Sequence, residues 1–234
     1  MIKILHLFPN LMNLYGEYAN VVVLGKHLKD QGLRVSVDKK DIHSSIVFDK
    51  YDMIYMGSGT ERNQKIALKE LMKYSEELKS FIEKGKLVLF TGNAMELLGK
   101  SINGEEALGF VDFTVEENTG KRYAGDVIVE NEELGKLVGF INKCSIITGG
   151  EDKKMFTYLF KDNSLIDNSF EGYHFSNVYG THIIGPVLVK NPNFMKLIVK
   201  SLMPDAHMYE EIAYPYEEDG YQITLTELEK RMKK

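Results

Sequence analysis

The segment with the clearest chemical meaning is the stretch 88–96, which reads Val-Leu-Phe-Thr-Gly-Asn-Ala-Met-Glu. Its pattern predicts a buried strand, a sharp turn and then a helix, an arrangement with which many α/β enzymes present a nucleophile. The turn position falls on Gly92, which has no side chain. Because glycine adopts strained turn conformations at little cost, the turn can persist without a reactive atom. The sequence therefore predicts the scaffold of a covalent catalyst without its nucleophile.

Two further loops are expected to lie beside this turn. One is the segment 9–15, after the first predicted strand, and the other is Gly57-Ser58-Gly59-Thr60. The backbone N–H groups of the second loop could hold an anion or a carbonyl oxygen, or its glycines could simply make a tight turn. We favour a pocket wall without chemistry. It is not a phosphate-binding loop, because the Gly-Lys-Ser/Thr ending is missing.

Strands and helices alternate in the first half of the chain. Apolar periodicity predicts strands over 3–8, 33–37, 52–56 and 86–90, and helices over 13–29 and 63–84. This alternation predicts a mostly parallel sheet flanked by helices, with ligands bound at the carboxyl ends of the strands. The second half predicts an antiparallel extension with short strands at 110–115, 125–129, 136–140 and 155–160. A helix over 193–202 is expected to close the domain.

Composition excludes several classes of protein. The 234 residues, with 44% hydrophobic and 27% charged side chains, are typical of a globular protein. A net charge of −5 argues against a general electrostatic role on nucleic acid or anionic membranes. No apolar run approaches the roughly 18 residues of a membrane span. The single cysteine, Cys144, excludes an internal disulfide, and no histidine or cysteine pair has metal-ligand spacing. We expect a cytoplasmic protein with no metal and no cofactor.

Five segments form a combined signal by their order and spacing. They are 12–20, 57–64, 107–113, 125–130 and 180–192. Together they resemble the class I glutamine amidotransferases of the cobyric acid synthase type, most of all the branch that supplies the amidotransferase subunit of lipid II isoglutaminyl synthase. The resemblance implies an α/β, flavodoxin-like sheet. We expect an amidotransferase-like domain over 1–203, then a Tyr/Glu-rich tail over 204–234 with a short helix at 225–234.

The catalytic positions of that family are replaced in this sequence. In the family an elbow cysteine attacks the side-chain amide of glutamine, a histidine assists, and ammonia passes to a partner active site. Carried over residue by residue, the cysteine position falls on Gly92 and the histidine position on Ile184. The family's Gly-Phe-Glu-Asn-His segment falls on 139–143, and the arginine that follows it is missing. The glutamine after the elbow falls on Glu96, whose charge would repel a substrate carboxylate.

The predicted pocket is lined by small and polar side chains. They are Gly57, Ser58, Gly59, Arg62, Gln64, Asn93, Glu96, His174 and His182. His182 would share a strand face with Ile184 and could partly replace the lost imidazole, although a polar residue at the rim is the simpler interpretation. We interpret His174 as structural, hydrogen-bonded near the cleft. Arg62 and Gln64 either shape the pocket or partner face, or cap and solvate a helix.

The resemblance implies a pseudoenzyme: a subunit without glutaminase activity that binds or scaffolds a Mur-ligase-like or cobyric-acid-synthase-like ATP-dependent enzyme, for example in peptidoglycan amidation. One alternative is an active amidotransferase or hydrolase whose nucleophile has moved to Cys144 or Thr91. Another is a sensor that binds a small-molecule ligand in the pocket. The tyrosine-rich tail could be a docking segment or could pack on its own domain. The sequence leaves both interpretations of the tail open.

Overall fold

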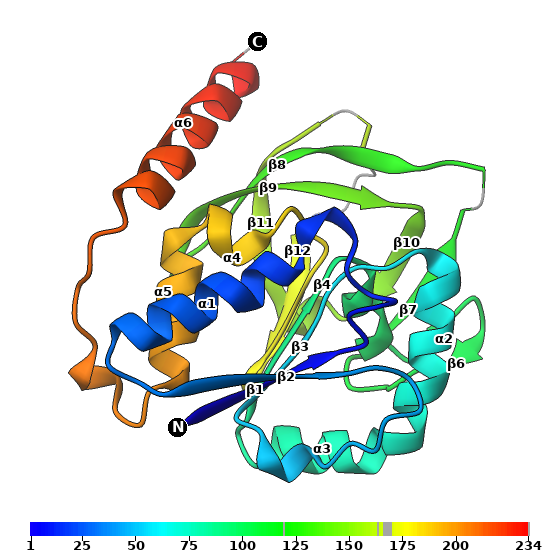
Figure 1. Cartoon of the computed structure of the whole chain (residues 1–234). Coiled ribbons are helices and arrows are strands. Elements are labelled where there is room, and N and C mark those ends of the chain that lie inside the picture. The colour runs from blue at the N-terminus through cyan, green and yellow to red at the C-terminus, as the bar shows by residue number, and fades with distance from the viewer. Residues whose placement is uncertain (119, 163, 166–169, 234) are drawn as a thin grey trace.

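The fold is built on a central sheet, here in a computed structural model that describes residues 1–118, 120–162, 164–165 and 170–233 (Figure 1). In this part of the chain nine strands pair in the order β2-β1-β3-β4-β13-β12-β11-β8-β9. Strands β1 to β4 and β13 pair in parallel, and β12, β11, β8 and β9 continue the sheet in antiparallel pairs. The predicted class, a mostly parallel core with an antiparallel extension, is confirmed.

The strand bounds follow the apolar runs of the sequence. The parallel part comprises β1 Ile2–Leu7, β2 Val35–Lys40, β3 Met53–Met56, β4 Leu87–Thr91 and β13 Val178–Thr181. The antiparallel part comprises β8 Tyr123–Asn131, β9 Gly135–Lys143, β11 Lys154–Lys161 and β12 Phe170–Phe175. A second sheet contains β10 Ser145–Gly149, β7 Phe113–Glu117, β5 Ser101–Ile102 and β6 Glu105–Glu106, in that spatial order. Five of these strands lie outside the segments predicted from the sequence: β5, β6, β10, β12 and β13.

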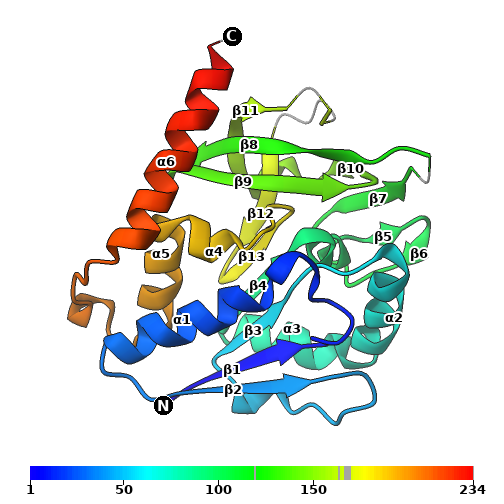
Figure 2. The same cartoon turned by 45° about the horizontal axis from the view of Figure 1, so that its top comes forward.

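Helices cover both faces of the sheet, because its central strands are apolar on both sides. In β4, Val88 and Phe90 join a core beneath α2 (Glu61–Leu71) and α3 (Ser75–Glu83). Leu87 and Leu89 join a second core beneath the helices of the other face. These are α1 (Tyr18–Asp30), α4 (Val187–Lys190) and α5 (Pro192–Leu202). Figure 2 shows the two helical layers on either side of the strands.

Several predicted helices differ from the structure. The helix expected over 13–29 begins at Tyr18, after a 3-10 turn, Leu14–Gly16. The helix expected over 63–84 is interrupted by a 3-10 turn, Met72–Tyr74. This turn lets the apolar stripes of both α2 and α3 reach one core. The tail helix α6 spans Pro215–Met232, longer than the predicted 225–234. Pro215 fits the first turn of a helix because its φ is fixed and it lacks an N–H, and Glu217 and Glu218 in that turn complement the helix dipole.

The tail contacts the domain along one side. Tyr221 Oη donates to the Lys136 carbonyl at 2.7 Å, and Leu228 is buried against β8 and β9. Tyr216 and Ile223 remain exposed on the same helix. Within the described ranges no helix has the length and apolarity needed to cross a bilayer.

Candidate functional site

The predicted turn lies at the carboxyl edge of the sheet. Strand β4 ends at Thr91, and Gly92 begins a 3-10 helix, Gly92–Leu98, in place of the expected α-helix. Gly92 has a φ of +59°, in the left-handed region that favours glycine. A Cβ atom on Gly92 would lie 2.5 Å from the Ser58 side chain and 3.1 Å from Cγ2 of Ile184. Ser58 and Ile184 therefore fill the space into which a side chain at Gly92 would extend.

The glycine-rich loop packs against this turn and forms one wall of a cavity of about 260 Å³. The Gly59 N–H donates to Asn93 Oδ1 at 2.9 Å, and Asn93 Nδ2 donates to the Gly59 carbonyl at 3.0 Å. An N–H group has one hydrogen to donate, so this one is already committed. The contacts favour the pocket-wall interpretation of the loop over the anion-holding one.

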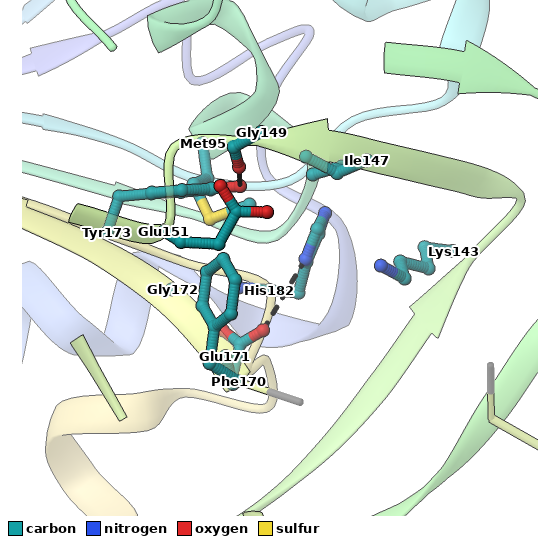
Figure 3. Close-up of a pocket in the computed structure, with 10 residues that line it drawn as sticks. All are labelled: Met95, Lys143, Ile147, Gly149, Glu151, Phe170, Glu171, Gly172, Tyr173 and His182. Atoms are coloured by element: carbon teal, nitrogen blue, oxygen red, sulfur yellow. Dashed lines mark hydrogen bonds and ion pairs between the residues drawn. The ribbon is translucent and has the colours of Figure 1, made fainter. Parts of the chain in front are cut away.

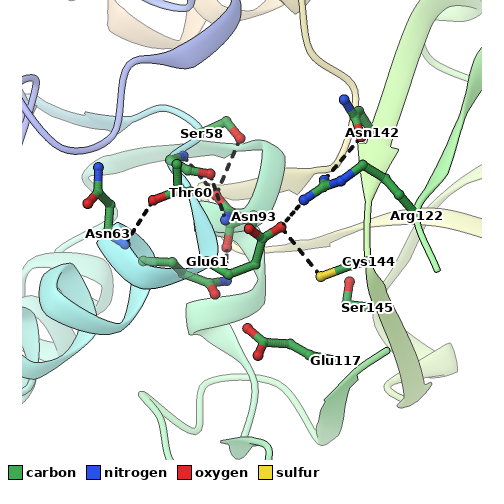
Figure 4. A network of polar contacts seen from close by, with 12 residues as sticks. Ser58, Thr60, Glu61, Asn63, Asn93, Glu117, Arg122, Asn142, Cys144 and Ser145 are labelled. Carbon is green, nitrogen blue, oxygen red and sulfur yellow. Dashed lines mark hydrogen bonds and ion pairs between the residues drawn. The ribbon is translucent and has the colours of Figure 1, made fainter. Parts of the chain in front are cut away.

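A polar corner on the opposite wall of this cavity joins α2 to strand β9 and the residue after it (Figure 4). Arg122 donates from Nη2 to Glu61 Oε1, and from Nη1 to Asn142 Oδ1 at 3.1 Å. The Cys144 thiol lies 3.4 Å from the same Glu61 oxygen. Burial, with the charge and hydrogen bond of Glu61, raises the pKa of Cys144 to about 12. A thiol that stays protonated at neutral pH is a poor nucleophile, so the corner disfavours the relocated-nucleophile alternative.

Thr91, the other alternative nucleophile, is fully buried under the turn. Its hydroxyl donates to the Glu17 carboxylate and lies 3.1 Å from Tyr55 Oη. Burial raises the pKa of Glu17 even though Thr91, Tyr55 and the Gly185 N–H bond to it. These groups bond to one another beneath the turn, where a substrate has no access to the Thr91 hydroxyl.

Glu96 lines the cavity of about 260 Å³, the larger of two cavities at this site. Its side chain is buried and is not exposed to a ligand in the way that the sequence suggested. Its carboxylate accepts hydrogen bonds from Gln64 Nε2 at 2.6 Å, from His182 Nε2 at 3.1 Å and from the Ser145 hydroxyl. Burial alone would raise the pKa of Glu96, but the hydrogen bond and charge of His182, with the bonds from Ser145 and Gln64, hold it below its ordinary value.

His182 connects Glu96 to a second buried carboxylate. Its Nδ1 lies 3.5 Å from Glu171 Oε2, and its backbone N–H donates to Glu171 Oε1 at 2.7 Å. Burial would raise the pKa of Glu171, but His182, Thr181 and Lys143 together lower it. The predictions that His182 lies at the rim and shares a face with Ile184 are wrong. Strand β13 ends at Thr181, so His182 and Ile184 do not lie on a strand, and the rule that residues two apart share a strand face does not apply to them. The His182 side chain is buried between two carboxylates.

Lys143 ends strand β9 and borders both the larger cavity and a second one of about 170 Å³. Its amine points toward His182 across the smaller cavity (Figure 3). Burial lowers the pKa of Lys143, and the charges of Glu171 and Glu96 oppose this only in part. We call Glu96, Glu171, His182 and Lys143 the buried ionic cluster. Together they place two carboxylates and two basic groups in the interior, beside a hollow.

The remaining predicted pocket residues take different places. Gln64 is fully buried and supports the turn, donating to the Asn93 carbonyl at 2.7 Å. Gly57 is buried at the start of the loop and lines neither cavity. Arg62 is exposed and also lines neither cavity, which favours a solvating role for Arg62. His174 was predicted to be structural, and it bonds to the Ser176 carbonyl at 3.0 Å and stacks on Tyr179. It lies by the β12–β13 hairpin, so its expected place near the cleft is wrong.

Sequence reasoning missed five charged residues of these cavities: Glu61, Arg122, Lys143, Glu151 and Glu171. Arg122 stands just before the motif at 125–130, and its partner Glu61 follows the glycine-rich loop. Lys143 occupies the histidine position of the family segment 139–143. A charged residue at the end of an apolar strand could have indicated that Lys143 belongs to the site. Glu171 is a single acid within Phe-Glu-Gly-Tyr, and an isolated acid in a short strand carries little information. Among the residues with described positions, none form a group of three side chains suited to a metal ion.

Comparisons with known proteins agree with this fold. The CobB/CobQ-like glutamine amidotransferase domain matches residues 3–192. The Staphylococcus aureus protein named lipid II isoglutaminyl synthase (glutamine-hydrolyzing) subunit GatD is 32% identical over 201 residues, which cover 81% of this chain and 79% of that protein. The protein of the same name from Streptococcus pneumoniae is 28% identical over 225 residues, which cover 93% of this chain and 86% of that protein.

A solved structure gives the same picture at the level of fold. The crystal structure of a glutamine amidotransferase from Thermotoga maritima superposes with a TM-score of 0.57 at 13% identity, covering 99% of this chain and 97% of that one. Similarity at this identity supports the architecture and leaves the chemistry to the site.

Proposed function

The chain belongs to the CobB/CobQ-like glutamine amidotransferase family, and on this premise we propose that it is a glutaminase-silent subunit. It binds and scaffolds a Mur-ligase-like ATP-dependent enzyme that amidates lipid II in the cytoplasm. The two relatives are both named as subunits of a lipid II isoglutaminyl synthase, which supports the partner and the substrate class. The proposal separates two functions that those relatives' names combine, hydrolysis of glutamine and membership of the synthase.

The observation that carries the silent half of the proposal is the packing at Gly92. A reactive side chain there would collide with Ser58, and Ile184 occupies the position where the family has its histidine. Covalent amide hydrolysis needs a nucleophile within hydrogen-bond reach of a base. Neither requirement is met at this turn, and the packing leaves no room for a simple substitution to restore them.

The two alternative nucleophiles support the same conclusion. Cys144 is held as a thiol by burial and by Glu61, and its bonded neighbour is a carboxylate rather than an imidazole. Thr91 is enclosed beneath the turn with Glu17 and Tyr55. To act as a nucleophile, Thr91 would have to become accessible from beneath the turn, and Cys144 would need a base in place of Glu61.

The test combines two assays on the purified chain and on its complex with the Mur-ligase-like enzyme of the same organism. The chain alone is expected to release no glutamate from glutamine. The complex is expected to amidate lipid II with ATP and ammonium chloride but not with ATP and glutamine. The Staphylococcus aureus relative, assayed with its own partner, serves as the positive control.

The outcomes separate the two halves of the proposal. Glutamine turnover that Cys144→Ala abolishes would overturn the silent half and restore the relocated-nucleophile alternative. Failure of the chain to bind the ligase, with lipid II amidated equally well in its absence, would overturn the scaffold half. Silence in the glutaminase assay combined with complex formation is the result that we expect.

A further inference from the structure

The smaller cavity holds a basic group that the proposed function does not use. Lys143 is 6% exposed, and its amine faces a hollow of about 170 Å³. Within the described part of the chain, Glu171 and Glu96 act on this amine through space, with no hydrogen bond to it. Because no described protein group hydrogen-bonds to this amine and Lys143 lines the cavity, the amine is available to a molecule that enters it.

The other members of the buried ionic cluster already form hydrogen bonds or ion pairs with protein groups. Glu171 receives bonds from the Thr181 hydroxyl at 2.6 Å and from the His182 backbone, and Glu96 receives bonds from Gln64 and Ser145. The His182 ring lies between the two carboxylates. Lys143 is therefore the group of the cluster that is left to contact a molecule in the cavity.

The charges around the cavity select the kind of molecule. Two buried carboxylates act on the Lys143 amine, and Glu151 adds a third acidic side chain to the cavity wall. An anion would be repelled by this surplus of carboxylates, whereas the same carboxylates offset part of the desolvation cost of a cation formed at the amine. Met95, Ile147 and Tyr173 add apolar side chains to a lining that is otherwise mostly polar, which allows for a short alkyl chain.

From this geometry we propose that Lys143 forms a Schiff base with a small neutral aldehyde held in the smaller cavity. The Nζ lone pair attacks the carbonyl carbon, and a proton moves from nitrogen to oxygen to give a carbinolamine. One proton from solvent then allows the hydroxyl to leave as water, and the nitrogen lone pair forms the C=N bond of an iminium ion. The step consumes the aldehyde and one proton, releases one water, and needs no oxidant or reductant.

The low pKa that burial gives Lys143 assists this chemistry, because a larger share of the amine is unprotonated at neutral pH than for a solvent-exposed lysine. The carboxylates of Glu171 and Glu96 then lie near the iminium charge that forms. Solvent-exposed lysines such as Lys100, which pairs with Asp112 at the surface, have no such enclosure.

The experiment treats the full chain at neutral pH with butanal at low dose and sodium cyanoborohydride, which reduces an iminium ion to a stable secondary amine. Intact-mass measurement and peptide mapping locate the added butyl group. We expect a single addition on Lys143, its loss in Lys143→Met, and its retention in the matched surface variant Lys100→Met. Pyruvate, a carbonyl compound that carries a carboxylate, is expected to label Lys143 less than butanal.

Peptide mapping of the unmodified sequence keeps the test decisive even where Lys143→Met fails to fold. Label spread over exposed lysines with none on Lys143 would overturn the site. Stronger labelling by pyruvate than by butanal would overturn the assignment to a neutral carbonyl compound. Neither result bears on glutaminase silence, because the trapping assay does not involve glutamine.

Discussion

The turn at Gly92 and the buried ionic cluster lie at the same edge of the sheet, but they are filled in opposite ways. Around Gly92, Ser58 and Ile184 pack so closely that an added Cβ has no room. In the cluster, four ionisable side chains are retained in the interior beside a cavity. Close packing leaves no room for a side chain in the first region, whereas buried charge keeps the second region polar at a cost in desolvation.

The two regions are held in their conformations by different physical forces. At the turn the constraint is steric and sits in backbone conformation and contact distances. In the cluster it is electrostatic, and each charge depends on its neighbours for compensation. Variants of the two regions should therefore fail for different reasons, and with different dependence on pH.

The largest effect is expected from His182→Leu. This change leaves Glu96 and Glu171 buried without their shared partner, and breaking a buried pair in this way costs about 3–5 kcal/mol. The free energy of unfolding, measured by urea titration, reports the loss. The exposed residue His207 supplies the matched control, since His207→Leu should change the free energy by less than about 0.5 kcal/mol.

A second variant sharpens the same test. Adding Glu171→Gln to His182→Leu removes one of the uncompensated charges, so part of the lost stability should return. If the double variant is less stable than His182→Leu alone, the ionic account of the cluster is wrong. The carboxylates would then be held chiefly by their other hydrogen bonds.

A smaller decrease in the free energy of unfolding is expected from Gly92→Ala. The positive φ costs about 1–3 kcal/mol for a residue with a Cβ, and the collision with Ser58 adds to it. Gly16→Ala is the matched control, because Gly16 has a φ of +73° with nothing within 4 Å of the added atom. Urea titration of both variants separates the clash from the backbone strain.

Rescue by Ser58→Gly tests the steric explanation directly. Combined with Gly92→Ala, it should return the stability to that expected from backbone strain alone. Equal losses in Gly92→Ala and Gly16→Ala, with no rescue, would show that Ser58 moves aside freely. The turn could then accept a side chain, and the strongest argument for silence would weaken.

The smallest effect is expected in the pH dependence, because two opposite shifts partly cancel. Glu96 and Glu171 have pKa values held below the ordinary 4.5. Their contribution to stability is complete above that pH and is lost as the pH falls through their lower folded pKa values. Burial raises the pKa of Glu17. The contribution of Glu17 is therefore present below pH 4.5 and is lost as the pH rises.

Urea midpoints measured between about pH 6 and pH 3 test these signs. Relative to the unmodified chain, the decline on acidification should be shallower in Glu96→Gln and steeper in Glu17→Gln. Opposite changes in slope are the essential result. Two variants that alter the slope in the same direction would contradict the assignment of one of the two shifts.

The fold was largely readable from the sequence because its signals are local. The apolar runs at 3–8, 52–56 and 86–90 correspond to β1, β3 and β4, and alternation with helices specified a parallel sheet. Strands β12 and β13 were missed because they are short and contain glycine, tyrosine and histidine rather than a clear period. They are held by pairing with β4 and β11, partners that are distant in the sequence.

The sequence by itself determined the class of fold, the glycine at the turn and the isoleucine at the family's histidine position, since these follow from residue identity and order. Only the tertiary structure decided that Ser58 blocks Gly92, that burial and Glu61 keep Cys144 protonated, and that His182 joins Glu96 to Glu171. Packing and burial depend on residues far apart in the chain. The same residue types would behave differently at other distances, because desolvation and steric overlap change steeply over a few ångströms.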